Sequence, residues 1–394
     1  MTPVAGSDVD LRAAVAHLAA IERPPASEGE REAAVWIAGA LRDLGAQARI
    51  EEERVHGGYF APMGLPAAAS ALAGIAVLRG ARAAGLVGAV ATGVMAEDLQ
   101  GGPARWLRSR LPQRTTWNVV GELGAPDAPH TLVVFAHHDA ARSSFVFDPV
   151  VPKLVFERAP WLHDHLDRWP PLMGGVVAGP ALVALGAALG RRRITAAGTA
   201  ISAVSAGLMA HMSRQPVVPG ANDNLTGVAV LLEVARHLGG DAPDGLRIVL
   251  LSTGSEEANQ DGMLAFAKRH FGELDRERTT FLCLDTVGSP ELVLIEGEGF
   301  LRMRDYDAAT KDLVEGAARD AGVHLRRGLR FTFATDALIP LRQGFRVAGM
   351  GSVNEWLVPT NYHAPTDTPD NVDFRSVRDA VGVVLGVVDR LRTR

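Results

Sequence analysis

Histidine and acidic residues gather at the carboxyl ends of predicted strands and in the loops that follow those strands. They are His137, Asp139, Asp223, Glu256, Glu257, Asp285 and His363. Each of them alone has an ordinary structural explanation, such as a helix cap, a turn or a solvated surface position. Together on one rim of a sheet, the carboxylates would repel one another strongly unless protons or a cation compensated their charge. The pattern therefore indicates a metal site.

The donor types narrow the kind of metal. Two histidines with several carboxylates and no thiolate suit zinc or a similar divalent ion, and cobalt or manganese would use the same ligands. Cys283 is the single cysteine, which excludes an internal disulfide and a cysteine-based cluster. The candidate ligands are too many for one catalytic zinc with an open position. They suit two metals that share a bridging carboxylate.

One of these residues, Asp223, lies in the stretch from Gly220 to Gly227, which reads Gly-Ala-Asn-Asp-Asn-Leu-Thr-Gly and precedes a predicted helix at 228–238. An aspartate between small and amide residues at such a turn has its carboxylate aimed by the turn. An ordinary helix cap is the commoner explanation of such a stretch alone. The other acidic and histidine residues favour a ligand here.

Strands alternate with helices around these residues. We expect strands at 46–55, 118–123, 131–136, 246–252, 279–284, 291–296 and 345–353, and helices at 8–21, 27–44, 228–238, 307–321 and 374–391. This alternation predicts an α/β fold, a three-layer α/β/α sandwich with a mainly parallel mixed sheet covered on both faces. In such sheets, ligands bind at the carboxyl ends of the strands.

Two apolar blocks at 61–96 and 171–212 interrupt the alternation, and each is broken in the middle only by arginines. We interpret them as two inserted hydrophobic helical hairpins whose arms approach the roughly 20 residues that cross a bilayer, although the arm at 83–96 is short. Trp161 and Trp169 suit an interfacial belt. The alternative is four Ala- and Gly-rich helices packed in a soluble core or an oligomer interface, and membrane insertion is favoured over it.

Four arginines follow the first block: Arg105, Arg108, Arg110 and Arg114. Their alternation with Trp106 and leucines predicts an amphipathic segment lying at an interface. Together with the absence of a signal peptide at the N-terminus, they favour a cytoplasmic location for the main domain. The arginines at the hairpin tips favour the opposite orientation.

Composition excludes other classes of protein. With 394 residues, of which 47% are hydrophobic and 22% charged, the chain can bury a full core in one large domain or two. Its net charge of -5 provides no basic field, so we expect no nucleic-acid partner.

These residues and their neighbours resemble metallopeptidase family 28, the di-zinc aminopeptidases and related exopeptidases. The motifs that carry the resemblance are His137-His138-Asp139, Gly220 to Asn224 with Gly227, Glu256-Glu257, Leu284-Asp285, and Tyr362-His363 before Asp367-Thr368. The preceding strand, Trp117 to Val120, agrees as well. The resemblance covers residues 8–55, 117–140 and 219–394 and leaves out both hairpins.

The resemblance implies two zinc ions. The implied ligands are His137 and Asp285 for one ion, Glu257 and His363 for the other, and Asp223 as the bridge. Asp139 would orient the ring of its neighbouring histidine. Glu256 would act as the general base on a water held by the two metals. Tyr362 would donate a hydrogen bond to the tetrahedral intermediate.

The sequence departs from the family pattern beside the glutamate pair. Relatives commonly have two glycines and a serine there, whereas Asn259 and Met263 replace the first glycine and the serine, and only Gly262 remains. Ala140 replaces another common serine. Asparagine tolerates left-handed backbone, so the loop can survive. These changes affect specificity more than the metal chemistry.

We therefore expect residues 1–60, 115–140 and 217–394 to form one peptidase domain. Residues 61–114, with the first hairpin and the amphipathic linker, and 141–216, with the second hairpin, would be insertions. The resemblance implies a membrane-associated zinc exopeptidase, with aminopeptidase activity on peptide or protein N-termini favoured. A carboxypeptidase or a glutaminyl cyclase is the alternative enzyme. An inactive membrane scaffold is the non-enzymatic alternative, and the retention of Glu256 argues against it.

Overall fold

A seven-stranded mixed sheet forms the centre of the computed structural model, which describes residues 8–239 and 244–392. Its strands lie in the order β1-β2-β4-β3-β5-β10-β6. Their bounds are β1 Gln47–Val55, β2 Arg114–Leu123, β3 His130–His137, β4 Leu246–Thr253, β5 Thr279–Leu284, β6 Glu291–Ile295 and β10 Arg346–Val353. Strands β4, β3, β5 and β10 are parallel neighbours, whereas antiparallel pairs complete both edges. The expected mixed sheet is confirmed, with its parallel part at the centre.

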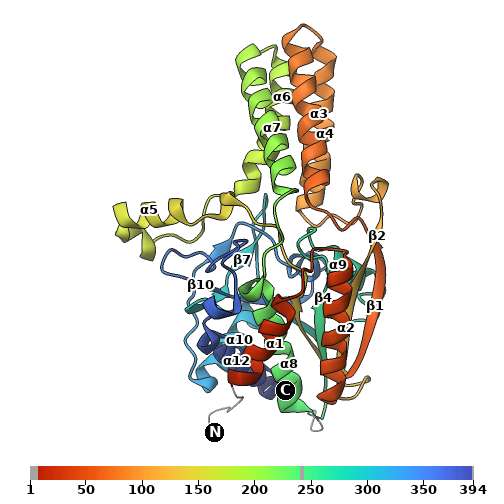
Figure 1. Cartoon of the computed structure of the whole chain (residues 1–394), viewed down its shortest axis with the longest axis vertical. Helices are drawn as coiled ribbons and strands as arrows, with labels where there is room; N and C mark the ends of the chain where they lie inside the picture. Colours follow the sequence, from red (N-terminus) through yellow and green to blue (C-terminus); the bar gives the residue numbers. More distant parts are fainter. Residues whose placement is uncertain (1–7, 240–243, 393–394) are drawn as a thin grey trace.

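Helices cover both faces of this sheet and produce three layers (Figure 1). One face carries α1 Asp8–Ala19, α2 Glu28–Asp43, α8 Thr226–Leu238, α10 Ala308–Ala321 and α12 Phe374–Arg392. The other carries α9 Asp261–His270 and α11 Leu338–Arg342. A small second sheet contains β7 Gly297–Glu298, β8 Arg304–Asp305 and β9 Arg330–Phe331. Residues 1–7, where no signal peptide is expected, lie outside the described residues.

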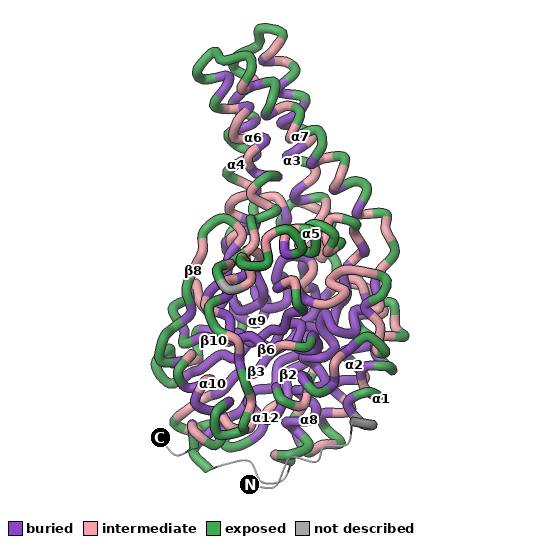
Figure 2. Tube along the Cα trace, turned by 90° about the vertical axis from the view of Figure 1, so that its left-hand side faces the viewer, coloured by how far each residue is buried: buried purple, intermediate pink, exposed green. Residues whose placement is uncertain are grey.

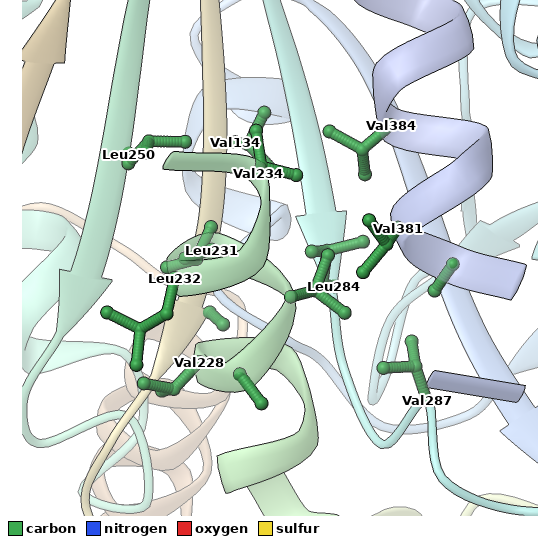
Figure 3. Packing of buried hydrophobic residues seen from close by; sticks show 14 of the residues in the cluster. Val134, Val228, Leu231, Leu232, Val234, Leu250, Leu284, Val287, Val381 and Val384 are labelled. Atoms are coloured by element: carbon green, nitrogen blue, oxygen red, sulfur yellow. The ribbon is translucent and has the colours of Figure 1, made fainter. Parts of the chain in front are cut away.

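The central strands are apolar on both faces because both faces are covered. In β3, Leu132 and Val134 point to the cluster beneath α8 and α12, whereas Val133 and Phe135 point to the cluster beneath α9. Figure 3 shows part of the first cluster, where residues of α8 and α12 pack together against the sheet. Burial on both sides of a strand explains its continuous apolar run, which is typical of parallel sheets. This core holds the strand ends in fixed relative positions.

The two apolar blocks form four helices that stand together as a bundle projecting from the sheet domain (Figure 1). They are α3 Phe60–Leu78, α4 Gly85–Leu99, α6 Leu172–Leu189 and α7 Arg192–Met212. Helices α3, α6 and α7 are long and apolar enough to cross a bilayer by length and composition. Glycines allow close packing, since a Cβ on Gly74 would lie 2.0 Å from Thr199 Oγ1 and one on Gly198 would lie 2.6 Å from the Val183 nitrogen.

The bundle buries some hydroxyl groups among apolar and small residues and carries large apolar side chains on its outer surface. Ser70, Thr195 and Ser202 are buried between the helices, and the Ser202 hydroxyl lies 3.4 Å from that of Ser70. Leu72 and Val204 point outward and are 69% and 71% exposed. Figure 2 shows the corresponding contrast between the buried interior of the sheet domain and the largely unburied bundle. A helix on the surface of a water-soluble protein carries charged and polar residues on its outer face.

The prediction of an amphipathic interface segment after the first hairpin is wrong for two of its arginines. Arg105 and Arg108 are buried, and each forms an ion pair with Asp98 near the end of α4, at 3.0 and 2.6 Å. Periodicity suggested a solvated face because it cannot reveal a buried carboxylate partner. Trp169 is only half-buried and donates a hydrogen bond to the Leu357 carbonyl at 3.2 Å, whereas Trp161 is exposed.

Candidate metal centre

Three groups of possible ligand atoms lie at the rim where the parallel strands end; one comprises His137, Glu256 and Glu257, and the other two, called the ligand groups below, share Asp223. The first of these two comprises His137, Asp223 and Asp285, and the second comprises Asp223, Glu257 and His363. In each group, one ligand atom per residue lies within 4.8 Å of the others. His137 ends β3, Asp285 directly follows β5, and Glu257 lies in the turn after β4. The register of three parallel strands therefore brings together residues that are far apart in sequence.

The carboxylate of Asp223 lies between the two histidines. Its Oδ1 atom is 3.2 Å from His137 Nε2, and its Oδ2 atom is 3.1 Å from His363 Nε2. Glu257 Oε1 lies 3.3 Å from the same nitrogen of His363. One carboxylate thus faces both ligand groups, which is the position that a bridging ligand requires.

The loop that carries Asp223 is aimed by Asp367. The Asp367 carboxylate accepts the backbone N–H of Asn222 at 2.7 Å and that of Asp223 at 3.1 Å. Gly220 has a φ of 60°, and a Cβ there would lie 2.6 Å from the Asp223 carbonyl oxygen. The sequence contained Asp367 within a motif but gave no hint of this positioning role, which depends on a contact across 144 residues.

Asp139 holds the turn of the glutamate pair as well as the ring of His137. Its two carboxylate oxygens accept the backbone N–H groups of Glu256 and Glu257 at 3.0 and 3.1 Å. His137 Nδ1 lies 3.5 Å from Asp139 Oδ1 and 3.3 Å from the Asp139 carbonyl oxygen. The contact with His137 gives a geometric basis for the orienting role that we predict for Asp139. The bonds to the two N–H groups add a second role, in which Asp139 holds both glutamates toward the site.

Glu256 lies against both ligand groups. It offers an oxygen within 4.8 Å of ligand atoms of His137 and Glu257. Burial, together with the negative charges of Asp336, Glu257 and Asp285, raises the pKa of Glu256 well above its ordinary value, although His137 opposes this effect. A carboxylate in such surroundings binds a proton more readily than an exposed one, as a general base must.

The electrostatic field of the site favours cations. Burial lowers the pKa of His363, but the carboxylates of Glu257 and Asp223 outweigh burial and raise this pKa to about 10. Burial raises the pKa of Asp285 to about 7, with the charges of Asp223 and Glu257 adding to the effect. The same field that stabilises a protonated histidine would stabilise a divalent cation.

Three of the ligand atoms lack a hydrogen-bond partner within the described residues. They are Asp223 Oδ2, Glu257 Oε1 and His363 Nε2, and all three are buried. Buried polar atoms in folded proteins are nearly always satisfied. Because these atoms face one another at 3.1 and 3.3 Å, a cation bound between them would satisfy all three. Their nitrogen and oxygen donors match those that zinc accepts. The residues therefore fit divalent metal.

Tyr362 lies in an aromatic wall beside the second ligand group. Its ring stacks on that of His363 with centroids 4.0 Å apart, and Phe147 packs edge-on against both rings at 5.2 and 4.5 Å. Burial and the nearby carboxylates raise the pKa of Tyr362 well above its ordinary value. The hydroxyl therefore keeps its proton and can donate a hydrogen bond, as its predicted role requires.

Glu30 is a site residue that the sequence did not reveal. A Ser-x-x-Glu capping pattern marks the start of α2, and Ser27 caps this helix by accepting the Glu30 N–H at 3.2 Å. The Glu30 side chain, however, turns into the domain and accepts bonds from Thr116 Oγ1 at 2.6 Å and from the Ser255 nitrogen at 3.2 Å. A capping pattern placed the helix start but could not show that this carboxylate supports the turn before Glu256.

Arg23 and Asp336 were also missed. Arg23 is fully buried and donates to the carbonyls of His138 at 2.7 Å and Gly220 at 2.8 Å, so it ties the end of β3 to the Asp223 loop. Asp336 accepts a short hydrogen bond from the Thr253 hydroxyl, and its Oδ1 atom has no partner within the described residues. Neither residue lies in a motif, and nothing in the sequence distinguishes them.

Comparison with known proteins agrees with this geometry. Residues 202–388 match the family model for peptidase family M28, and a search of curated proteins found no match. The solved glutaminyl cyclase of Bacteroides thetaiotaomicron bound to N-acetylhistamine has a TM-score of 0.57 at 16% identity, covering 97% of each chain. A leucine aminopeptidase precursor from the same organism gives 0.56 at 16% identity, covering 97% of this chain and 96% of the other. BSAP, a zinc aminopeptidase from Bacillus subtilis, gives 0.54 at 15% identity, covering 97% of this chain and 94% of the other. At these identities the structures demonstrate a shared fold, and the expected family resemblance is confirmed.

Proposed function

Because residues 202–388 carry the signature of peptidase family M28, we propose that the chain is a membrane-associated zinc exopeptidase that removes N-terminal residues from peptides. The observation that carries the metal assignment is the pair of ligand groups joined at Asp223, with buried atoms on Asp223, Glu257 and His363 that lack partners among the described residues. Asp285 and His137 complete the set. Zinc has the strongest support from the family, and cobalt or manganese suits the same donors.

The residues of the chain divide the proposed chemistry among them. Two bound divalent ions would act as Lewis acids that polarise the scissile carbonyl and lower the pKa of water. Glu256 takes a proton from the attacking water and delivers it to the leaving amine. Tyr362 donates a hydrogen bond to the oxygen that gains negative charge. Asp139 holds the Glu256 turn and the His137 ring through the contacts described above.

The experiment that tests this function is hydrolysis of amino-acid p-nitroanilides with free and acetylated N-termini, in detergent with added zinc. We expect cleavage of the free amines only, because an aminopeptidase site must recognise a free α-amino group. Equal cleavage of both forms would contradict aminopeptidase specificity. Conversion of N-terminal glutaminyl peptides without hydrolysis would identify a glutaminyl cyclase instead, and metal binding with neither reaction would indicate a binding protein.

The membrane part of the proposal rests on the large apolar side chains exposed on the outer surface of the bundle. Hydroxyl groups of Ser70 and Ser202 face inward, whereas Leu72 and Val204 face outward. With 19 residues, α3 is about 28 Å long, close to the thickness of a bilayer's hydrocarbon core of about 30 Å. No acidic residue occurs at 60–96 or 171–212, and arginines gather at the two tips, where they would reach the far headgroups.

A second apolar surface lies at the base of the bundle. Helix α5 Val150–Arg158 extends sideways from the domain at the level where the bundle begins (Figure 1). Val150, Val151 and Trp161 are 61%, 66% and 64% exposed. A bilayer around the bundle would place its headgroup region at this level, where an exposed tryptophan is favourable. The cytoplasmic location of the peptidase domain stays a prediction, which loses support because Arg105 and Arg108 are buried in ion pairs.

Placing a charge on the outer face of the bundle is expected to weaken membrane binding. Val204→Asp puts a carboxylate near the middle of α7, which costs about 3 kcal/mol in a bilayer, or about 100-fold in partitioning. Flotation of the purified protein with liposomes measures this change. Val35→Asp is the matched control, since Val35 is 53% exposed on α2 in the sheet domain. If both variants float as well as the wild type, or the wild type does not float, the bundle is not embedded in lipid.

A further inference from the structure

The turn that carries the glutamate pair is a closed loop from Ser255 to Asp261. The Gln260 N–H donates to the Glu256 carbonyl at 2.8 Å, and the Asp261 N–H donates to the Ser255 carbonyl at 3.1 Å. Asn259 has a φ of 70° and Gln260 a φ of 60°, so both adopt left-handed backbone. A displacement of Asn259 or Gln260 is therefore transmitted to Glu256 through one hydrogen bond. Asp139 and Glu30 hold the Glu256 end of this turn, as described above.

The first hairpin holds the opposite end. Arg105 donates to the Asn259 carbonyl at 2.5 Å and to Asp98 Oδ1 at 3.0 Å. The Asn259 side-chain amide donates to the Asp98 backbone carbonyl at 2.6 Å. Asp98 belongs to the last turn of α4, so the end of a bundle helix is bonded directly to the turn from Ser255 to Asp261, called the glutamate turn below. All three residues are at least nine-tenths buried.

The other end of the hairpin reaches the same turn through Arg108. This guanidinium donates to Asp98 Oδ1 at 2.6 Å and to the Gly58 carbonyl, just before α3, at 2.7 Å. It also lies 3.6 Å from Asp261 Oδ2, which accepts the Gly57 N–H at 3.2 Å. Both ends of the first hairpin thus meet at the Asp261 end of the glutamate turn.

We propose that Arg105 is a positioning residue for Glu256, and that the first membrane hairpin thereby sets the alignment of the general base. This inference rests on the proposed function, because it takes Glu256 as the base. Hydrolysis depends on this alignment, since a misplacement of about 1 Å costs about 100-fold in rate. The contacts also explain why Asn259 replaces a family glycine: asparagine tolerates a positive φ and supplies the amide that binds Asp98.

The test compares Arg105→Met and Arg105→Lys with the wild type in detergent. Methionine keeps the apolar stem but cannot donate to Asn259, whereas lysine keeps the charge and one donor. For Arg105→Met we expect kcat to fall about 10- to 100-fold, with KM and zinc content within about two-fold of wild type. Arg105→Lys should recover part of this loss. Amide hydrogen exchange of residues 256–261 should become faster in Arg105→Met.

Two further variants keep the outcome decisive. Arg110→Met is the matched control, because Arg110 lies in the same segment but is exposed and donates to the Trp106 carbonyl at 2.5 Å, away from the glutamate pair. Asn259→Gly leaves the arginine in place and removes the amide that binds Asp98 and accepts a hydrogen bond from Gln260 at 3.3 Å, so it should reproduce part of the kcat loss and the faster exchange.

The outcomes separate this inference from the proposed function. Wild-type kcat in Arg105→Met, or a kcat loss that follows a parallel loss of zinc and of thermal stability, would overturn the positioning role. If the wild type itself hydrolyses nothing, the proposed function fails. Hydrogen exchange then still decides whether Arg105 orders the turn, and unchanged exchange at residues 256–261 would overturn the inference in either case.

Discussion

Glu256→Gln is expected to lower kcat by about 10²- to 10⁴-fold, the range that a general base contributes. Glutamine keeps the size of the side chain and leaves the Glu256 N–H bonded to Asp139, but an amide cannot accept the proton of the attacking water. Because the implied ligands exclude Glu256, zinc content should stay at the wild-type value. Steady-state hydrolysis of the preferred p-nitroanilide and elemental analysis of the purified protein measure the two quantities.

The control for this substitution is Glu273→Gln, since Glu273 is exposed just beyond the end of α9 and belongs to none of the ligand groups. That variant should be indistinguishable from the wild type. Should Glu256→Gln retain more than about a tenth of wild-type kcat, another group must carry the proton, and Asp336 would be the next residue to replace. A loss of zinc in Glu256→Gln would instead make Glu256 a ligand.

Asp223→Asn is expected to remove metal binding together with activity. The Asp223 carboxylate faces His137 and His363 at 3.2 and 3.1 Å, so its replacement affects both ligand groups at once. An amide offers one oxygen and no charge, and its NH₂ group would face a histidine nitrogen where a cation should bind. We expect zinc affinity to fall by more than about 100-fold, beyond the range of substitutions outside the ligand sphere. Zinc content after dialysis against a weak chelator measures this loss.

Two neighbouring aspartates give a graded comparison. Asp367→Asn keeps every ligand but weakens the bonds that aim the Asp223 loop, so its loss of zinc affinity should lie near about 10-fold. Asp370→Asn changes an exposed residue three positions later and should have no effect. If Asp223→Asn binds zinc as tightly as Asp367→Asn, Asp223 does not bridge two metals.

The first hairpin joins the bundle to the metal centre. Asp98 ends a helix of the bundle and contacts both Arg105 and Asn259, which belongs to the glutamate turn. A peptidase built in this way would have its general base held partly by a membrane segment. A change of lipid or detergent would then alter the activity by changing the alignment of Glu256, as well as by changing the solubility of the protein.

The sequence alone determined the fold class, the family resemblance and the candidate metal ligands. Apolar runs mark buried strands because a strand covered on both faces has no polar side, and polar residues directly after such runs must lie at the sheet rim. His137, Asp285 and Glu257 could be identified in this way without knowing their neighbours. Both hairpins could be identified because long apolar runs depend on local composition only.

Only the tertiary structure decided which side chains meet. That Asp223 faces two histidines, that Asp139 binds the N–H groups of both glutamates, and that Arg105 reaches Asn259 all depend on contacts between distant segments. Periodicity describes which face of an element is buried but not what lies opposite that face. The same limit made Arg105 and Arg108 look like interface residues and hid Glu30, because a buried charge is recognisable only with its partner.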